Sequence, residues 1–139
     1  MTDIVVTAAQ VSVVYPEKAE IFDFIATEAI TKGQAVYQLA TGKVGVADAN
    51  ASGKQQFRGI ALNKAAAGQA VSVLIRGHIY GFTVSGLNGD ALAYLSDTAG
   101  ALADAAGSMT VPVGRVVALP NPALTKVLFV DVPILTTWS

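Results

Sequence analysis

Short strand-like runs, each closed by a turn signal, constrain this chain more than any other feature of its sequence. Residues 71–75, 80–84 and 126–130 are rich in β-branched and aromatic side chains and are bounded by Gly, Pro or Asn. Turn residues recur at roughly one turn per strand, because Gly supplies positive φ and Pro fixes φ. The alanine-rich residues 65–67 and 101–106 are too short for a stable helix. The sequence therefore predicts an all-β fold.

An internal repeat limits how such strands can be arranged. Two halves, at about residues 29–76 and 85–132, follow the same order of turns and strands at separations of 55 to 58 residues. Neither half can bury its apolar face alone, which predicts one β-sandwich or jelly-roll-like barrel built from two related halves. The alternative is that Gly-punctuated β sequences align by chance. The clearest matched pairs are Gly33 and Gly89, Gly42 and Gly100, Gly59 and Gly114, and Val71 and Val127.

Residues 1–28 lie outside the repeat and precede the domain predicted for residues 29–139. They carry Val5, Val6, Val11 and Val13 ahead of Pro16. An extended apolar arm of this kind can add a strand to a neighbouring sheet edge. The alternative is an ordinary first strand of the same domain. Deletion separates the two readings, because loss of assembly with the fold kept indicates an arm, whereas unfolding indicates a strand.

The balance of apolar and charged residues indicates a surface that is covered in the working state. Apolar residues make up 53% of the 139 residues and charged residues 14%, whereas an average soluble domain carries roughly a quarter charged residues. This charge is too little to coat a free monomer. We therefore expect sister subunits or a partner to cover much of the surface.

Charge distribution and hydropathy argue against two kinds of partner. The net charge is -1 and no run of Lys or Arg occurs, so a nucleic-acid groove is not expected. No uncharged stretch reaches the roughly 18 to 20 apolar residues that span a bilayer, so no membrane contact is expected. The N-terminus lacks the pattern of a secretion signal, which predicts synthesis in a cytoplasm.

The residue types that carry chemistry are few. The chain has no Cys and a single histidine, His78, which leaves no thiolate or His-based metal set and one candidate base for a triad. Residues 48–53 match the first half of a calcium loop, but the final position of that loop is Gly59 instead of Glu. We therefore expect no catalytic residue, no cofactor and no metal, and a protein that is not an enzyme.

Six strings, taken in order, resemble the tailed-bacteriophage capsid cement, or head decoration, proteins. The match is weakest at residues 15–24 and 134–139. The resemblance implies a structural protein that binds the outer surface of a phage head, clamps adjacent major capsid protein subunits and associates with itself as a dimer or trimer. It also implies a location on the virion exterior after synthesis in the host bacterium. The strings are residues 29–37, 42–49, 58–62, 65–71, 88–100 and 113–117.

Apolar residues near the two ends of the chain are the candidate interface residues. Trp138 is the only tryptophan, and Trp is enriched among residues that dominate binding energy. The alternative for Trp138 is that it covers the bottom of its own domain. The candidate residues are Val5, Val6, Val11, Val13, Ile134, Leu135 and Trp138.

Two other function classes stay open. A lipoyl or biotinyl carrier domain is also all-β, has two quasi-equivalent halves and displays a modified lysine at a hairpin, a position that Lys43 would occupy. The residues before Lys43 lack the acidic and Met residues expected around such a lysine. A fibre or carbohydrate-binding adhesin usually presents a row of exposed aromatics, whereas aromatic residues here make up 7% and are scattered.

Overall fold

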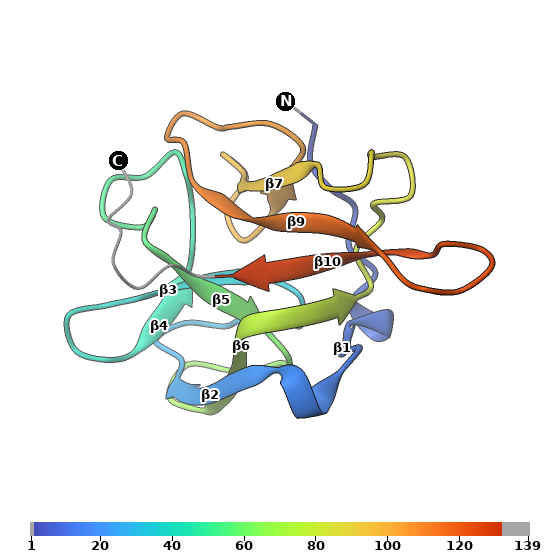
Figure 1. Ribbon diagram of the computed structural model, residues 1–139. Helices are drawn as coiled ribbons and strands as arrows, with labels where there is room; N and C mark the ends of the chain where they lie inside the picture. The colour runs from blue at the N-terminus through green and yellow to red at the C-terminus, as the bar shows by residue number, and fades with distance from the viewer. Residues whose placement is uncertain (1, 132–139) are drawn as a thin grey trace.

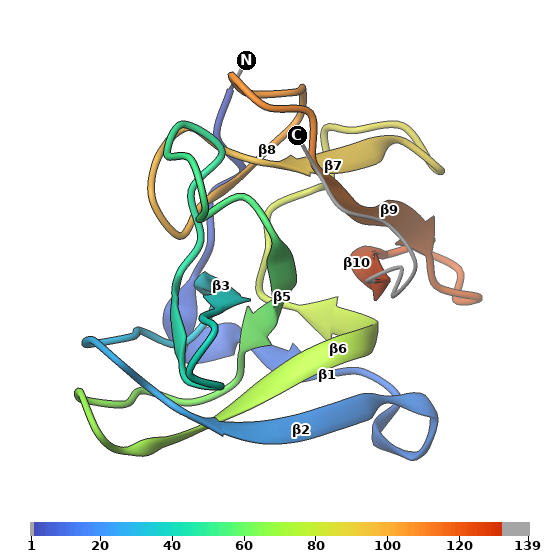
Figure 2. The same ribbon diagram turned by 90° about the vertical axis from the view of Figure 1, so that its left-hand side faces the viewer.

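A computed structural model describes residues 2–131 and has an all-β architecture, which confirms the predicted fold class. Its only helical elements in this range are two 3-10 turns, η1 and η2. All strand pairs between named strands are antiparallel, and the sheet curls into a half-barrel (Figure 1; Figure 2). The elements are η1 Ala8–Gln10, β1 Ser12–Val13, η2 Pro16–Lys18, β2 Glu20–Ile25, β3 Ala35–Gln38, β4 Val44–Val46, β5 Phe57–Ala61, β6 Ala70–Tyr80, β7 Leu92–Leu95, β8 Leu102–Ala103, β9 Pro112–Ala118 and β10 Lys126–Asp131.

The ten strands belong to one hydrogen-bonded sheet with the order β4-β3-β5-β6-β10-β9-β7-β8, while β1 and β2 pair separately with β6. In Figure 2 the curl brings β7 and β8 to the side of the molecule opposite β2. A sandwich or jelly roll of two related halves stays a prediction.

Strand β6 is the centre of the sheet. Its first part pairs with β2 on one side and with β5 on the other, and its second part pairs with β1 and β10. The sequence predicts separate strands at 71–75 and 80–84, but β6 runs unbroken from Ala70 to Tyr80. Gly77, which lies between the two predicted strands, is inside β6 and pairs with Val130. A glycine between two strand-like runs predicts two separate strands, because Gly is depleted in strand interiors.

Side-chain alternation along β6 divides the core into two clusters. Leu74 and Ile79 point into the larger cluster, which also receives Leu95 and Leu128. Val71 and Val73 point to the opposite face, into a smaller cluster that includes Ile30, Val36 and Val44. Each residue named here is fully buried. Successive residues of a strand face opposite sides, so the neighbours Val73 and Leu74 reach different clusters. The β2–β6 register shifts by one residue between Leu74 and Arg76, and beyond this shift Ile79 shares the cluster of Leu74.

Two glycines sit where strands approach most closely. A Cβ built at Gly59 on β5 would overlap the Leu74 carbonyl oxygen on β6 and would lie 2.6 Å from Val73 Cγ1. A Cβ built at Gly114 on β9 would overlap the Phe129 carbonyl oxygen on β10. In both places the obstacle is backbone of the neighbouring strand, so only Gly fits.

The N-terminal segment finds partners within its own chain. Ile4 donates its N–H to the Leu102 carbonyl at 2.8 Å, and Thr7 donates to the Gly81 carbonyl at 2.9 Å. The hydroxyl of Ser96, which is fully buried, donates to the Asp3 carboxylate and accepts the Thr98 N–H at 2.9 Å. Residues 2–14 are therefore joined to β6, to β8 and to the chain after β6.

Replacing Ser96 by alanine is expected to lower the free energy of unfolding by about 1 to 2 kcal/mol, because it removes the Asp3 partner and leaves the Thr98 N–H without an acceptor. Urea unfolding followed by circular dichroism measures this change. Ser52→Ala, at an exposed loop position, is the control and is expected to change stability by less than about 0.5 kcal/mol. Equal stabilities for the two variants would show that the Ser96 contacts contribute nothing.

Candidate interface

The edge strand β2 carries the largest group of exposed apolar side chains on one element. It pairs with β6 and with no other named strand of residues 2–131, and it lies on the outside of the curl in both views (Figure 1; Figure 2). The exposed fractions are 45% for Ile21, 63% for Phe22 and 42% for Ile25. A free edge presents unpaired backbone groups that another chain can bind. We call the six residues Glu20–Ile25 the β2 edge.

Hydrogen bonds just beyond β2 show which of its amides face outward. Ala26 donates its N–H to the carbonyl of Gln69, the residue just before β6. Thr27 donates to the Val44 carbonyl of β4, on the side of the chain away from β6. Bonding to one neighbour alternates along an antiparallel strand, and the β2–β6 register is regular from Ile21 to Ile25. The amides of Ile21, Asp23 and Ile25 therefore point away from β6.

One face of the β2 edge borders an open groove. Phe22 and Phe24 pack with ring centroids 5.2 Å apart, and Phe24 rests against the smaller core cluster. Ile75, Arg58 and Gln38 complete the far side of the groove, which has a volume of about 620 Å³. The groove thus has a mixed lining, in which the two phenylalanine rings lie beside polar side chains and one cation.

The other face of the β2 edge is apolar at both ends and acidic in the middle. Ile21, which also borders the groove, pairs with Leu74, and Ile25 pairs with Ala70. Between them the Asp23 carboxylate accepts a hydrogen bond of 2.8 Å from the Ser72 hydroxyl. Both faces of one strand therefore expose apolar side chains, which is unusual for an edge strand in contact with water.

The charge carried by the β2 edge is negative. Glu20 and Asp23 are both exposed, and neither belongs to the two ion pairs found among residues 2–131. The neighbouring cation on β6, Arg76, lies 3.8 Å from the Asp131 carboxylate. The edge thus keeps two exposed carboxylates outside any ion pair in this range.

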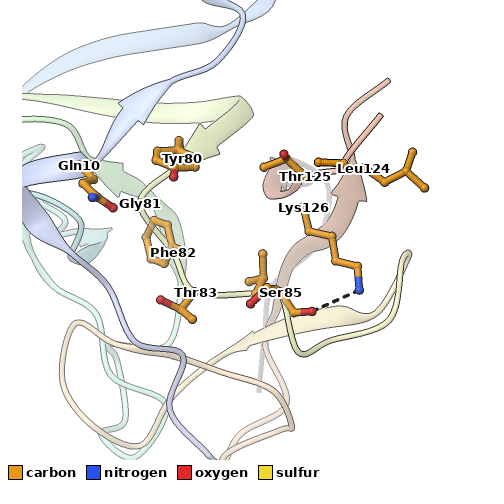
Figure 3. A pocket seen from close by; sticks show the side chains of 11 residues that line it. Gln10, Tyr80, Gly81, Phe82, Thr83, Ser85, Leu124, Thr125 and Lys126 are labelled. Carbon is orange, nitrogen blue, oxygen red and sulfur yellow. Dashed lines mark hydrogen bonds between the residues drawn. The ribbon is translucent and has the colours of Figure 1, made fainter. Parts of the chain in front are cut away.

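A second exposed apolar surface surrounds a shallow cavity of about 520 Å³ between the end of β6 and the loop before β10 (Figure 3). Tyr80 and Leu124 are exposed by 45% and 61% at its border. Lys126 Nζ donates to the carbonyl oxygens of Ser85, at 3.3 Å, and Leu87. These bonds hold the Lys126 ammonium against the loop after β6, and this contact stabilises one wall of the cavity.

The structure separates the candidate residues predicted from sequence. Val5 and Val6 are exposed by 64% and 39%, whereas Val11 is exposed by 1% and belongs to the larger core. Val13 is half-buried against the same core. Val11 thus offers no surface to a partner in this fold. The candidates Ile134, Leu135 and Trp138 lie outside the described residues.

Sequence reasoning missed the β2 edge, although a signal for it was present. A strand with one buried face alternates apolar and polar residues, but residues 21, 22, 24 and 25 are all apolar. This non-alternating run places large side chains on both faces. Glu17, Glu20 and Asp23, beside Lys18, are also typical of a solvated turn, and this pattern conceals the strand.

The groups that could support catalysis do not gather in the part of the chain that the structure describes. No three His, Asp or Glu side chains within residues 2–131 are placed to hold a metal ion. His78 lies between two aromatic rings, 5.3 Å from that of Tyr15 and 4.8 Å from that of Phe129. Lys43 is exposed at the turn between β3 and β4.

Across the described range, no helix is both long enough and apolar enough to cross a bilayer.

Stability is expected to depend on pH through His78. Burial lowers the pKa of His78 below its usual 6.5, and the positive charge of Lys18 lowers it further. The unfolded chain then binds a proton more readily than the folded chain, so stability is full above about pH 6.5 and falls as pH drops through the lowered pKa. Urea unfolding at about pH 7.5 and about pH 5.5 should show this fall in the wild type. The fall should be smaller in His78→Gln, and equal falls would exclude His78 as the cause.

Comparison of the chain with protein-family models, with curated proteins and with solved structures found no match.

Proposed function

We propose that the protein is a structural capsid cement protein of a tailed bacteriophage, which binds the outer surface of the head and clamps adjacent major capsid protein subunits. On this proposal it is a virion component and not an enzyme, made in the bacterial cytoplasm and carrying no cofactor. It contacts neither nucleic acid nor membrane. The proposal rests on the ordered strings that resemble cement proteins and on the surface chemistry of the fold.

Among the structural observations, the β2 edge is the one that carries the proposal. Phe22 is exposed by 63% on a strand that also exposes two isoleucines, in a chain with 14% charged residues. Covering apolar surface gains about 25 cal/mol for each Å² removed from water. A shell subunit that covers this edge would therefore gain binding energy without any chemistry.

Shell stabilisation follows if each copy touches more than one shell subunit. The β2 edge and the surface around Tyr80 and Leu124 are separate apolar surfaces on one rigid sheet. Two modest contacts joined by a rigid body reinforce each other, because the second binds at a high effective concentration. Self-association into a dimer or trimer would multiply the contacts further.

The two related halves are part of the proposal, and matching backbone hydrogen bonds support them. Gly33 donates its N–H to the Ala61 carbonyl at 2.8 Å, and Asp90, which follows the matched Gly89 by one residue, donates to the Val116 carbonyl at 2.7 Å. Gly33 and Asp90 both have positive φ. The sheet order also reads as β4-β3-β5-β6 beside β10-β9-β7-β8, in which the second set reverses the first. A duplicated unit would produce this order.

Phage heads assembled in a strain that lacks the gene for this chain provide the test. The purified protein should bind such heads to saturation and should raise the temperature at which they release DNA. Bovine serum albumin at the same concentration is the control. A monodisperse monomer that leaves the heads unoccupied would refute the proposed function.

A further inference from the structure

We propose that the β2 edge is a strand-acceptor site, which binds an extended segment of another protein whose apolar side chains alternate with Lys or Arg. The inference rests on the proposed function for the source of that segment, which is the capsid shell. The outward amides of Ile21, Asp23 and Ile25 would supply the backbone hydrogen bonds. Strand addition of this kind gains affinity from the backbone and specificity from alternate side chains.

The ends of the edge define its length. Beyond Ile25 the outward side is already occupied, because Thr27 donates to the Val44 carbonyl at 2.8 Å. Before Glu20 the chain turns away through η2, which starts at Pro16. An added strand is therefore limited to Glu20–Ile25. Within those limits the edge carries neither Pro nor Lys, the residues that commonly protect an edge from pairing.

A second copy of this chain is a poor occupant, because antiparallel self-pairing brings carboxylates together. With full overlap of the two β2 edges, Asp23 lies diagonal to Glu20 of the second copy. A shift of one residue in either direction places Asp23 directly opposite, or diagonal to, Asp23 of the second copy. Like charges in these positions destabilise a strand pair. The acidic residues thus act against self-pairing and leave the edge to a different chain.

The same carboxylates select a basic partner. Asp23 occupies the face away from the groove, where its Oδ1 accepts the Ser72 hydroxyl of β6, and a residue of an added strand would approach the same carboxylate from the opposite side. A Lys or Arg opposite it would form a cross-strand pair of opposite charge. On the other face Arg58 lines the groove. A cation there disfavours Lys or Arg of the added strand, so we expect apolar side chains against Phe22 and Phe24. The Lys or Arg side chains on either side of the one at Asp23 would lay their aliphatic stems over Ile21 and Ile25, so an alternating segment fits both faces.

Short synthetic peptides test the site on the full chain. The probe is a fluorescein-labelled peptide in which valine alternates with lysine. The controls are a valine–glutamate peptide and a valine–lysine peptide that is N-methylated on alternate residues. The valine–lysine peptide should bind at least tenfold more tightly than either control. Asp23→Lys should weaken its binding at least tenfold and strengthen binding of the glutamate peptide, while Asp23→Asn should lie between.

Three results would overturn the inference. The first is absence of peptide binding, or binding that N-methylation does not reduce. The second is a wild-type dimer in sedimentation experiments that Phe22→Glu dissociates, which would assign the edge to a second copy. The third concerns the fluorescence of Trp138, the single tryptophan. An emission maximum at longer wavelength in Phe22→Glu than in the wild type would assign the edge to the chain's own residues 132–139.

Measuring head binding and peptide binding side by side separates this inference from the proposed function. Head binding with no peptide binding would leave the cement function standing and remove the strand-acceptor site. Peptide binding with no head binding would keep the acceptor site and remove the cement function.

Discussion

Gly114→Ala is expected to lower the free energy of unfolding by about 3 kcal/mol or more, near the upper end of what overpacking costs. The new methyl group would overlap the Phe129 carbonyl oxygen, and its next contact is the Phe129 carbonyl carbon at 2.9 Å. Both atoms belong to the backbone of β10, which pairs with β9 along most of its length. The strain can be relieved only by separating the two strands. Domains of this size are stable by about 5 to 15 kcal/mol, so the variant should be largely unfolded when warmed.

Gly59→Ala should have a comparable effect, because its methyl group meets the Leu74 carbonyl oxygen on β6 in the same way. Gly86→Ala is the matched control, since a Cβ there meets no atom within 4 Å and its φ is not positive. Thermal and urea unfolding of the three variants give the comparison. A Gly114→Ala or Gly59→Ala variant as stable as Gly86→Ala would show that the strands do not approach as closely as described here.

The second large effect concerns head binding. The double variant Ile21→Thr with Phe22→Thr should bind cement-free heads at least tenfold more weakly than the wild type, a loss of about 1.4 kcal/mol or more. Threonine keeps the strand preference of the backbone while removing the apolar contact. Because both side chains are exposed, stability should change by less than about 1 kcal/mol.

The surface around Tyr80 and Leu124 supplies a matched control. Tyr80 is as exposed as Ile21, at 45%, and Leu124 nearly as exposed as Phe22, at 61% against 63%. Tyr80→Thr with Leu124→Asn therefore removes a similar amount of apolar surface, and Asn tolerates the positive φ of position 124. Co-sedimentation with heads measures both variants. Stronger loss of binding in the control would move the main interface from the β2 edge to the second surface.

Local patterns were enough to predict the all-β class and some of its strands, because β-branched runs and turn residues report on the backbone near themselves; they missed β2, and of the predicted strand 80–84 only Tyr80 lies in a named strand. The runs at 71–75 and 126–130 lie in β6 and β10. Such patterns do not predict which strands pair when they lie far apart in the sequence. Val11 resembles an exposed arm residue in sequence, yet it is buried beside Gly33 and Gly81, where added Cβ atoms would meet it at 3.1 and 2.8 Å. Only the folded chain brings these three positions together.

The candidate interface was predictable only in kind. A low charge content indicates that some apolar surface is covered, but it does not locate that surface. Phe22 is a candidate because β2 pairs on one side alone. Edge position depends on where β6 lies in the sheet, which the residues 20–25 do not encode by themselves.

Hydrogen–deuterium exchange of the β2 edge, in the free protein and in protein bound to cement-free heads, tests the central claim most directly. The outward amides of Ile21, Asp23 and Ile25 should exchange fast in the free protein, since they have no partner strand among residues 2–131. Head binding should protect them and leave the exposed loop at residues 51–54 unchanged. Fast exchange of the edge on occupied heads, with protection elsewhere, would contradict the account.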